Sequence, residues 1–264
     1  MKTLILVATT KPYRMPNSAI YLPVQVGAAG KASIGYARDD SGENISTKNA
    51  NYCELTGLYW AWKNWQVEAV GLVHYRRHFG HHGIGDKFAR VLNEQDVEKL
   101  LTQADIVVAK KRHYYIETNE SQYAHAHHGK DLQSLRACIA EQCPTYLPSF
   151  ETVMRRRSGH RFNTLIMKKA KLDAYCTWLF ALLADMEKRV DLSTYDPYQA
   201  RVFGYLAERL LDVWLLHNHE KVVEQTLLYM EKQNWALKIG KFVHRKYRGI
   251  VRKKRHSADN NNGK

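Results

Sequence analysis

The stretch Val70-Gly-Leu-Val-His-Tyr-Arg-Arg-His-Phe79 begins as a core strand and ends as a cationic, aromatic turn. The apolar run Ala69–Val73, which contains one glycine, predicts a buried β-strand. Ligands of open α/β sheets bind beyond the carboxyl ends of the strands, where the connecting loops diverge. Guanidinium groups match phosphate oxygens in shape and charge, so Arg76 and Arg77 could form an anion site. The alternative is a basic turn that is simply solvated.

Apolar runs and helical periodicities on both sides of this stretch predict the remaining elements. We expect strands at residues 2–8, 105–109 and 161–168, and helices at 51–62, 93–103, 130–142, 171–188 and 198–217. Asn51 and Glu54 fit a capping box for the first helix, and Asn93 fits an N-cap for the second. Thr118–Gly129 is polar and is expected to be a loop. The alternation of strands and helices predicts a single α/β sandwich of the Rossmann type over residues 1–235.

The composition is that of a globular protein, with 264 residues of which 45% are hydrophobic. Met1–Thr9 reads as a first strand rather than a signal peptide, and no apolar run reaches the about 20 residues that span a bilayer. The four cysteines have no metal-ligand spacing, which favours small core side chains in a reducing cytoplasm.

Most of the net charge of +14 comes from the end of the chain. The stretch Lys238–Arg255 contains no acid and nine cations: Lys238, Lys241, Arg245, Lys246, Arg248, Arg252, Lys253, Lys254 and Arg255. Apolar residues are interleaved with them, so residues 236–264 are predicted to be a tail with a basic amphipathic helix at Leu237–Arg255. Such a helix binds a membrane surface or a nucleic acid, or is simply solvated.

Several kinds of site are excluded by their missing motifs. The chain has no GxxxxGK[ST] loop, GxGxxG turn, GxSxG elbow or HExxH helix. Histidines cluster in two groups, at residues 74–82 and 125–128, from which a metal site could be built. The first group is mixed with arginines, which repel a cation, so we favour phosphate donors or exposed loop histidines over metal ligands.

Three acidic positions could bind a ligand or move a proton. Asp39 and Asp40 stand in a turn, where paired acids either bond a ribose or base or simply shape the turn. Glu208 lies in an otherwise apolar helix segment. An acid in that position is either a structural ion-pair partner or a general base that faces the crevice.

Segments along most of the chain together resemble a known family. They are Asp39–Asn49, Tyr52–Asn64, Gly71–Phe79, Arg161–Lys169, Tyr175–Phe180 and Arg201–Leu210. In order and spacing, these segments are similar to bacterial glycosyltransferases of capsular polysaccharide, exopolysaccharide and O-antigen synthesis, a family long catalogued as a domain of unknown function. The resemblance implies a GT-A-like fold and transfer of a sugar, with galactose or galactofuranose favoured, from a UDP-sugar. The linkage, the anomeric outcome, the acceptor and the oligomeric state remain open.

The resemblance also implies roles for individual residues. GT-A enzymes usually hold a divalent metal with an Asp-x-Asp motif, and here that place in the chain order is taken by His74-Tyr-Arg-Arg77. We therefore expect no cofactor and weak or absent metal dependence, with the cations neutralising the diphosphate themselves, so that a divalent metal is the less favoured alternative. From their place in the chain order of the family, the donor-binding residues are expected to be Asp39, Asp40, Asn44, Lys48, Asn49, His74, Tyr75, Arg76 and Arg77. Glu208 is the first candidate for the base and Asp196 the second, and Arg201 and Tyr198 are assigned to the acceptor.

Partners and location follow from the same resemblance. A surface-polysaccharide enzyme meets a polyprenyl-diphosphate-linked glycan at the inner membrane, so we expect a cytoplasmic protein held on that membrane by residues 237–255. The alternative is an RNA-binding protein without catalytic activity. Lys110-Lys-Arg-His-Tyr-Tyr115 favours it, because cations pair with phosphates and aromatic rings stack on bases.

Overall fold

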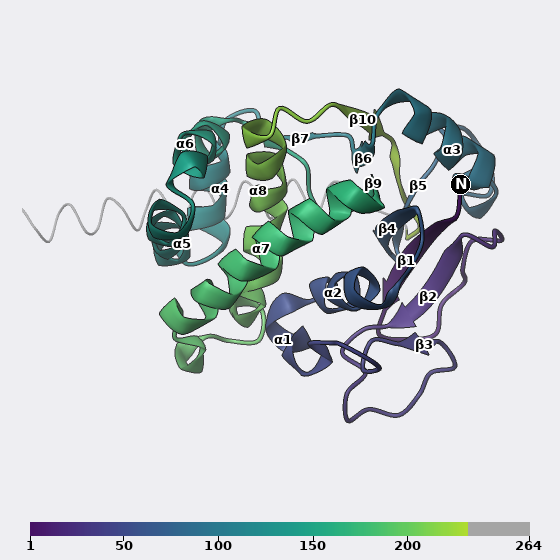
Figure 1. Cartoon of the computed structure of the whole chain (residues 1–264), viewed down its shortest axis with the longest axis horizontal. Helices are drawn as coiled ribbons and strands as arrows, with labels where there is room; N and C mark the ends of the chain where they lie inside the picture. The colour runs from purple at the N-terminus through teal and green to yellow at the C-terminus, as the bar shows by residue number, and fades with distance from the viewer. Residues whose placement is uncertain (232–264) are drawn as a thin grey trace, which may run out of the picture.

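The computed structural model describes residues 1–231, and the predicted helix at Leu237–Arg255 lies outside them. A mixed sheet forms the centre, in the order β10-β6-β9-β4-β1-β2-β3 (Figure 1). Its strands are β1 (Thr3–Thr9), β2 (Tyr21–Gln25), β3 (Ala37–Arg38), β4 (Ala69–His74), β6 (Ile106–Ala109), β9 (Leu165–Lys168) and β10 (Val222–Gln225). Two short strands, β5 (Arg77–Phe79) and β11 (Leu227–Tyr229), extend it beside β4.

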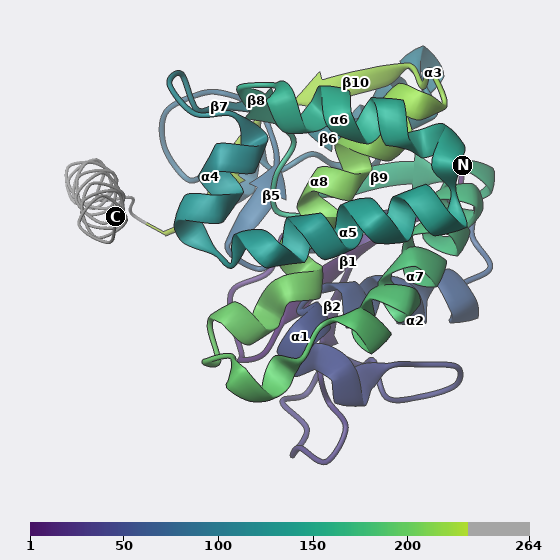
Figure 2. The same ribbon diagram turned by 90° about the vertical axis from the view of Figure 1, so that its left-hand side faces the viewer.

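Both faces of the sheet are buried, because successive side chains of each strand point to opposite sides. Leu6 and Leu72 face the larger core, under α2 (Leu55–Asn64), α5 (Gly129–Gln142), α7 (Lys169–Arg189) and α8 (Val202–His217). Ile5 and Val73 face a smaller core with α3 (Glu94–Gln103). The helices therefore form layers on either side of the sheet, as Figures 1 and 2 show. This arrangement confirms the predicted α/β sandwich.

One strand runs against its neighbours. β9 pairs antiparallel with both β4 and β6, whereas β1, β2, β4, β6 and β10 share one direction. The residues just before β9 consequently lie at the same edge as the carboxyl ends of the parallel strands. Those residues are Arg161–Thr164, which the sequence had assigned to the strand itself.

Two local predictions were wrong. Asn51 and Glu54 form no capping box: α1 (Asn49–Tyr52) ends before Cys53, and Asn51 donates to the carbonyl of Ala200 instead. Thr118–Gly129 is not a loop but holds α4 (Asn119–Ala126), which Thr118 caps. The cap predicted at Asn93 is present and forms a full capping box with Asp96.

The remaining elements are short or peripheral. They are α6 (Leu147–Arg155), β7 (Arg112–His113), β8 (Ser158–Gly159), η1 (Ser46–Lys48), η2 (Phe88–Arg90), η3 (Pro144–Tyr146), η4 (Leu192–Thr194) and η5 (Gln199–Arg201). The four cysteines are unpaired thiols. Within residues 1–231, no helix has the length and apolar character needed to cross a bilayer.

Candidate functional site

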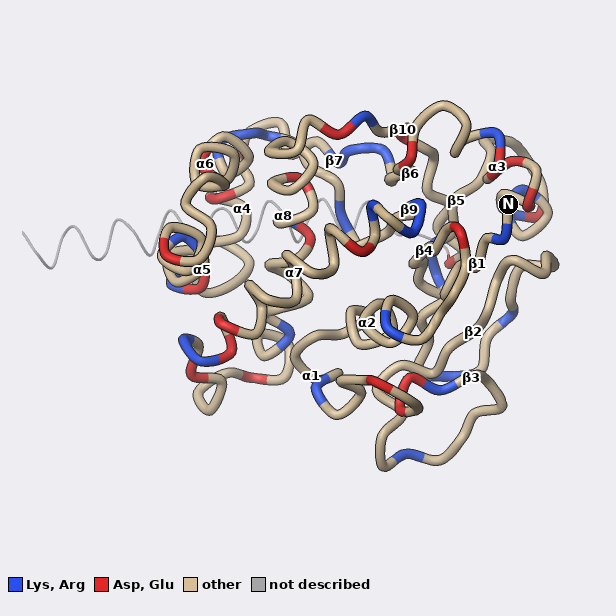
Figure 3. The backbone as a smooth tube through the Cα atoms, in the orientation of Figure 1, with Lys and Arg blue, Asp and Glu red and all other residues tan. Residues whose placement is uncertain are grey.

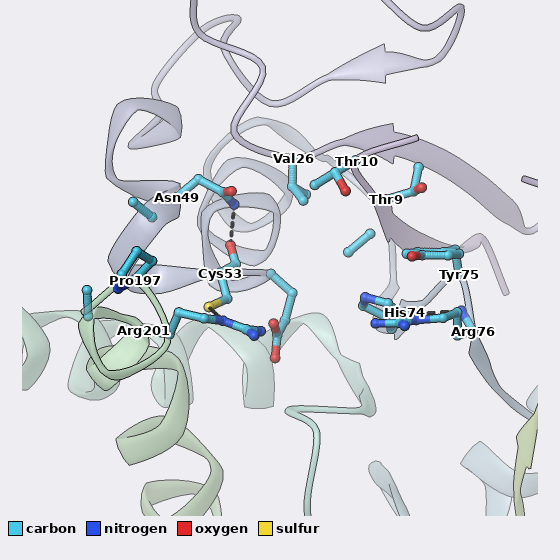
Figure 4. A pocket seen from close by; sticks show the side chains of 14 residues that line it. Thr9, Thr10, Val26, Asn49, Cys53, His74, Tyr75, Arg76, Pro197 and Arg201 are labelled. Carbon is cyan, nitrogen blue, oxygen red and sulfur yellow. Dashed lines mark hydrogen bonds between the residues drawn. The ribbon is translucent and has the colours of Figure 1, made fainter. Parts of the chain in front are cut away.

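A cleft of about 420 Å³ opens at the carboxyl edge of the sheet, beside the ends of β1 and β4 and the start of α8 (Figure 4). It is lined by Ala8, Thr9, Thr10, Val26, Asn49, Ala50, Cys53, Glu54, His74, Tyr75, Arg76, Pro197, Ala200 and Arg201. Five residues predicted for the site are among them: Asn49, His74, Tyr75, Arg76 and Arg201. The cleft therefore brings together parts of the predicted donor and acceptor sets.

His74 and Arg77 close a tight turn between β4 and β5, where they pair across the two strands. The backbone N–H of Arg76 donates to His74 Nδ1 over 3.3 Å. Burial, together with the charges of Arg77 and Arg76, lowers the pKa of His74 to about 3. The imidazole is therefore neutral at pH 7, and with Nδ1 as an acceptor its proton lies on Nε2. His74 thus offers a ligand an N–H donor and no full charge.

Arg77 carries a half-buried charge beside the cleft. Its guanidinium lies 4.1 Å from the centroid of the Phe162 ring, on which it stacks. Burial lowers the pKa of Arg77, and no side chain of residues 1–231 pairs with its guanidinium in a hydrogen bond or ion pair. Arg76 lines the cleft and lies 3.5 Å from Glu231. Glu54 and Glu208 act on Arg77 at longer range, but neither forms an ion pair with it. A half-buried cation that forms no ion pair is costly, so this arrangement favours an anionic ligand.

Glu54 is the acidic side chain of the cleft lining, and the sequence had given it only a capping role. The preceding residue, Cys53, has a φ of 55°, which separates α1 from α2 and directs the chain toward the cleft. Burial raises the pKa of Glu54, and the nearby carboxylate of Glu208 raises it further. A half-buried carboxylate in a cleft whose pKa is raised has the character of a general base.

Two residues in left-handed conformations connect Glu54 and Glu208. Phe162 and Asn163, just before β9, have φ values of 72° and 49°. Asn163 Nδ2 donates to Glu54 Oε1 over 2.8 Å, and the backbone N–H of Phe162 donates to Glu208 Oε1 over 3.1 Å. Strained backbone of this kind persists where surrounding contacts hold it, and it concentrates at functional sites. Here it brings two carboxylates and the ring under Arg77 to one place.

The two predicted bases are engaged in other contacts. Glu208 accepts from Phe162 with one oxygen and lies 3.2 Å from Arg209 Nη1 with the other. Asp196 Oδ1 accepts the backbone N–H groups of Tyr198 and Gln199, so it shapes the turn that leads into η5. Neither side chain is part of the cleft lining. Their catalytic roles stay predictions.

Asp39 and Asp40 lie away from the cleft lining. Asp39 is fully buried and accepts four hydrogen bonds, from the backbone of Gly27 and Ala28 and from the hydroxyls of Ser46 and Thr56. It ties the loop after β2 to α2. Asp40 pairs with Arg38 over 2.6 Å. Both acids are engaged in structural contacts, and their contact with a nucleoside stays a prediction.

The other donor and acceptor candidates are spread around the rim. Asn44 closes a local turn by donating to Gly42, and Lys48 pairs with Glu187 over 2.7 Å. Arg201 Nε donates to Cys53 Sγ over 3.1 Å, which links α8 to the α1–α2 junction across the cleft (Figure 4). Tyr198 is half exposed and stacks on His127.

The cleft lining does not suit a divalent cation. Such ions bind several oxygen ligands, and carboxylates above all. Glu54 already accepts from Asn163, and Arg76 and Arg201 on the same lining repel a cation. Among residues 1–231 no group of three or more His, Cys, Asp or Glu is placed to hold a metal. Independence from metal stays a prediction that the donor set supports.

Comparisons with known proteins identify related chains. Residues 4–219 match a family described as a domain of unknown function, DUF4422. The chain is also similar to the solved apo structure of WbbM, a bifunctional glycosyltransferase, with a TM-score of 0.82 and 29% identity. The match covers 88% of this chain and 46% of that one, so the chain spans about half the length of this relative. No curated protein matches. The likeness confirms the fold class and the resemblance to a glycosyltransferase family.

Proposed function

Because the chain belongs to the DUF4422 family and shares its fold with a bifunctional glycosyltransferase, we propose that it transfers a sugar from a nucleoside diphosphate sugar to a glycan acceptor. The observation that carries the proposal is the half-buried Arg77, whose guanidinium forms no hydrogen bond or ion pair within residues 1–231 and lies beside a cleft at the carboxyl edge of the sheet. The diphosphate of the donor would supply a directly paired negative charge.

In the proposed reaction, the acceptor hydroxyl oxygen forms a bond to the anomeric carbon while the bond from that carbon to the diphosphate breaks. Negative charge grows on the leaving diphosphate, and Arg77 and Arg76 stabilise it. His74 Nε2 donates a hydrogen bond to the same group. The proton of the acceptor hydroxyl passes to a carboxylate, for which Glu54 is better placed than Glu208 because it lines the cleft.

The finer assignment rests on the resemblance of the sequence segments. We propose a UDP-sugar as donor, with galactose or galactofuranose favoured, and a polyprenyl-diphosphate-linked glycan as acceptor in surface-polysaccharide synthesis. Arg201 and Tyr198 stand on the α8 side of the cleft, where an acceptor would approach. A panel of nucleotide sugars tests the donor. Hydrolysis of one UDP-sugar faster than the others would support the proposal. If the protein neither bound nor turned over any sugar of the panel, the proposal would be overturned.

Activity should survive removal of divalent metals. The reason is that Arg76, Arg77 and neutral His74 offer the diphosphate positive charge and donors without a metal bridge. Turnover measured after dialysis against EDTA should stay within about twofold of the untreated enzyme. A loss of activity that manganese or magnesium alone restores would contradict this prediction.

The basic tail is proposed to hold the protein on the inner face of the cell membrane. Lys238–Arg255 carries nine cations and no acid, and each cation near an anionic surface contributes about 1 kcal/mol. Deletion of residues 236–264 should therefore shift the protein from the membrane pellet to the supernatant. Equal pelleting of the truncated and full-length chains would argue against this role.

A further inference from the structure

A short two-stranded ribbon beside the main sheet carries a strained turn. The basic ribbon, defined here as residues 110–116 and 155–159, is built on the antiparallel pair β7 and β8. Tyr115 has a φ of 58°, and the backbone N–H of Ile116 donates to the carbonyl of Tyr114 over 2.6 Å, which closes a three-residue γ-turn. Turns of this hand are rare and strained, so contacts around the turn must maintain it.

Those contacts come from the second half of the ribbon. Arg157 Nη1 donates to the carbonyl of Tyr115, and the backbone N–H of Tyr114 donates to the carbonyl of Arg157. The buried Asn119 side chain ties the same segment down through the carbonyls of Val153 and Ser158. The turn is therefore held in place rather than left to move as a free loop tip.

The turn holds two apolar side chains in solvent. Tyr115 is 80% exposed and Ile116 is 55% exposed, although Tyr114 between them and β7 is buried. The exposed tyrosine and isoleucine bury little surface within the fold, so this strained turn adds little to its stability. Apolar side chains displayed in this way are typical of a surface that binds something else.

The apolar tip is surrounded by positive charge. Figure 3 shows the run of Lys and Arg on the chain around β7. Five cations of the ribbon have no acidic partner within residues 1–231: Lys110, Arg112, Arg155, Arg156 and Arg157. Lys111 pairs with Glu224, and Glu117 is buried against His125. The surface around Tyr115 and Ile116 is therefore predominantly cationic.

The ribbon stands at the same edge of the sheet as the cleft. β6 ends at Ala109, and the ribbon begins with the next residue. Because β6 runs in the direction of β1 and β4, its carboxyl end lies on the edge where those strands end at the cleft. Figure 2 shows β7 at the side toward which β10 points. A surface bound by the ribbon therefore lies at the same edge of the sheet as the cleft.

We propose that the basic ribbon docks on an anionic lipid bilayer, with Tyr115 and Ile116 inserted at the boundary of headgroups and acyl chains. Tyrosine is suited to that boundary, an aliphatic side chain gains free energy in it, and the cations pair with lipid phosphates. Single-stranded RNA fits less well, because bases stack on aromatic rings and an exposed isoleucine offers them no such face. This docking surface is separate from the tail and does not depend on the reaction in the cleft.

Sedimentation of the full-length chain with vesicles tests the proposal. The variant is Tyr115→Asn with Ile116→Ser, because asparagine tolerates the left-handed conformation at residue 115. With vesicles that contain phosphatidylglycerol, the variant should partition roughly tenfold less than the parent chain. An unchanged thermal midpoint for the variant shows that the fold is intact.

Ile84 provides the matched control, since it is fully exposed on another loop, between β5 and η2. Ile84→Ser should leave the partition unchanged, and phosphatidylcholine vesicles should bind the parent chain weakly. Equal partition of the ribbon variant and the parent would overturn the proposal. It would also be overturned if Ile84→Ser had the same effect, or if the ribbon variant lost only binding to single-stranded RNA.

Discussion

Replacement of Glu54 by glutamine should lower turnover by a factor on the order of 10²–10⁴ while the protein stays folded and still binds its donor. Glutamine has nearly the same shape, and its carbonyl oxygen still accepts the hydrogen bond from Asn163. The lost property is the ability to take the proton of the acceptor hydroxyl. Steady-state turnover with a saturating donor, together with the donor dissociation constant, separates this loss from a loss of binding.

Glu208→Gln and Asp196→Asn are the matched comparisons. Each removes one carboxylate that was predicted for the same role, and each side chain is engaged in structural contacts. Their turnover should fall less than that of Glu54→Gln. Normal turnover in Glu54→Gln together with a large loss in Glu208→Gln would assign the base to Glu208 instead.

The pH profile gives an independent readout of the base. A base acts in its deprotonated form, and burial raises the pKa of Glu54. The rate of the parent enzyme should therefore increase with pH through a range above that of an ordinary glutamate, about 4.3. This acid limb should disappear in Glu54→Gln. A limb that remains in the variant would belong to another group.

Replacement of Arg77 by glutamine should raise the dissociation constant of the donor by roughly 10- to 150-fold, the range expected for about 1.5–3 kcal/mol of charge-assisted hydrogen bonding. The guanidinium stacks on Phe162 and forms no ion pair or hydrogen bond within residues 1–231, so the ligand would supply a directly paired counter-charge. The free protein should be no less stable, since the variant removes a half-buried charge. Calorimetric titration with UDP and thermal unfolding measure the two effects.

Arg14 is the matched control for this substitution. It also stacks on a phenylalanine, with its guanidinium 4.4 Å from the centroid of Phe88, but it pairs with Asp86 over 2.6 Å. Arg14→Gln should leave UDP binding unchanged. Unaltered UDP affinity in Arg77→Gln would remove Arg77 from the donor site and with it the observation that carries the proposed function.

Much of the scaffold was predictable because it depends on local patterns. The strand Ala69–His74, the cap at Asn93 and the helices near 130–142, 171–188 and 198–217 all show their period and end signals within a few residues. The place of the basic turn His74–Arg77 at the end of a core strand was predictable for the same reason, since its residues are contiguous in the chain, and its role as an anion site stays a prediction. His74, Tyr75 and Arg76 do line the cleft.

Glu54 could not be recognised from the sequence. Its spacing from Asn51 matched a capping box, and only the positive φ of Cys53 breaks the helix there and turns the carboxylate toward the cleft. Gly204 on α8 packs against Cys53, so this conformation depends on a contact between segments about 150 residues apart. The sequence did contain one signal: Glu54 follows Cys53 within Tyr52–Asn64, one of the segments that resemble the glycosyltransferase family.

The sequence by itself determined the fold class, the basic turn after β4 and the charge of the tail, because side-chain periodicity and contiguous chemistry are properties of the local chain. Only the tertiary structure decided which acid lines the cleft. β9 runs antiparallel, which returns Phe162 and Asn163 to the carboxyl edge, and there Asn163 meets Glu54 across 109 residues of sequence. A contact between residues so far apart in the sequence depends on the direction of a strand within the sheet, and no local pattern of residues encodes that direction.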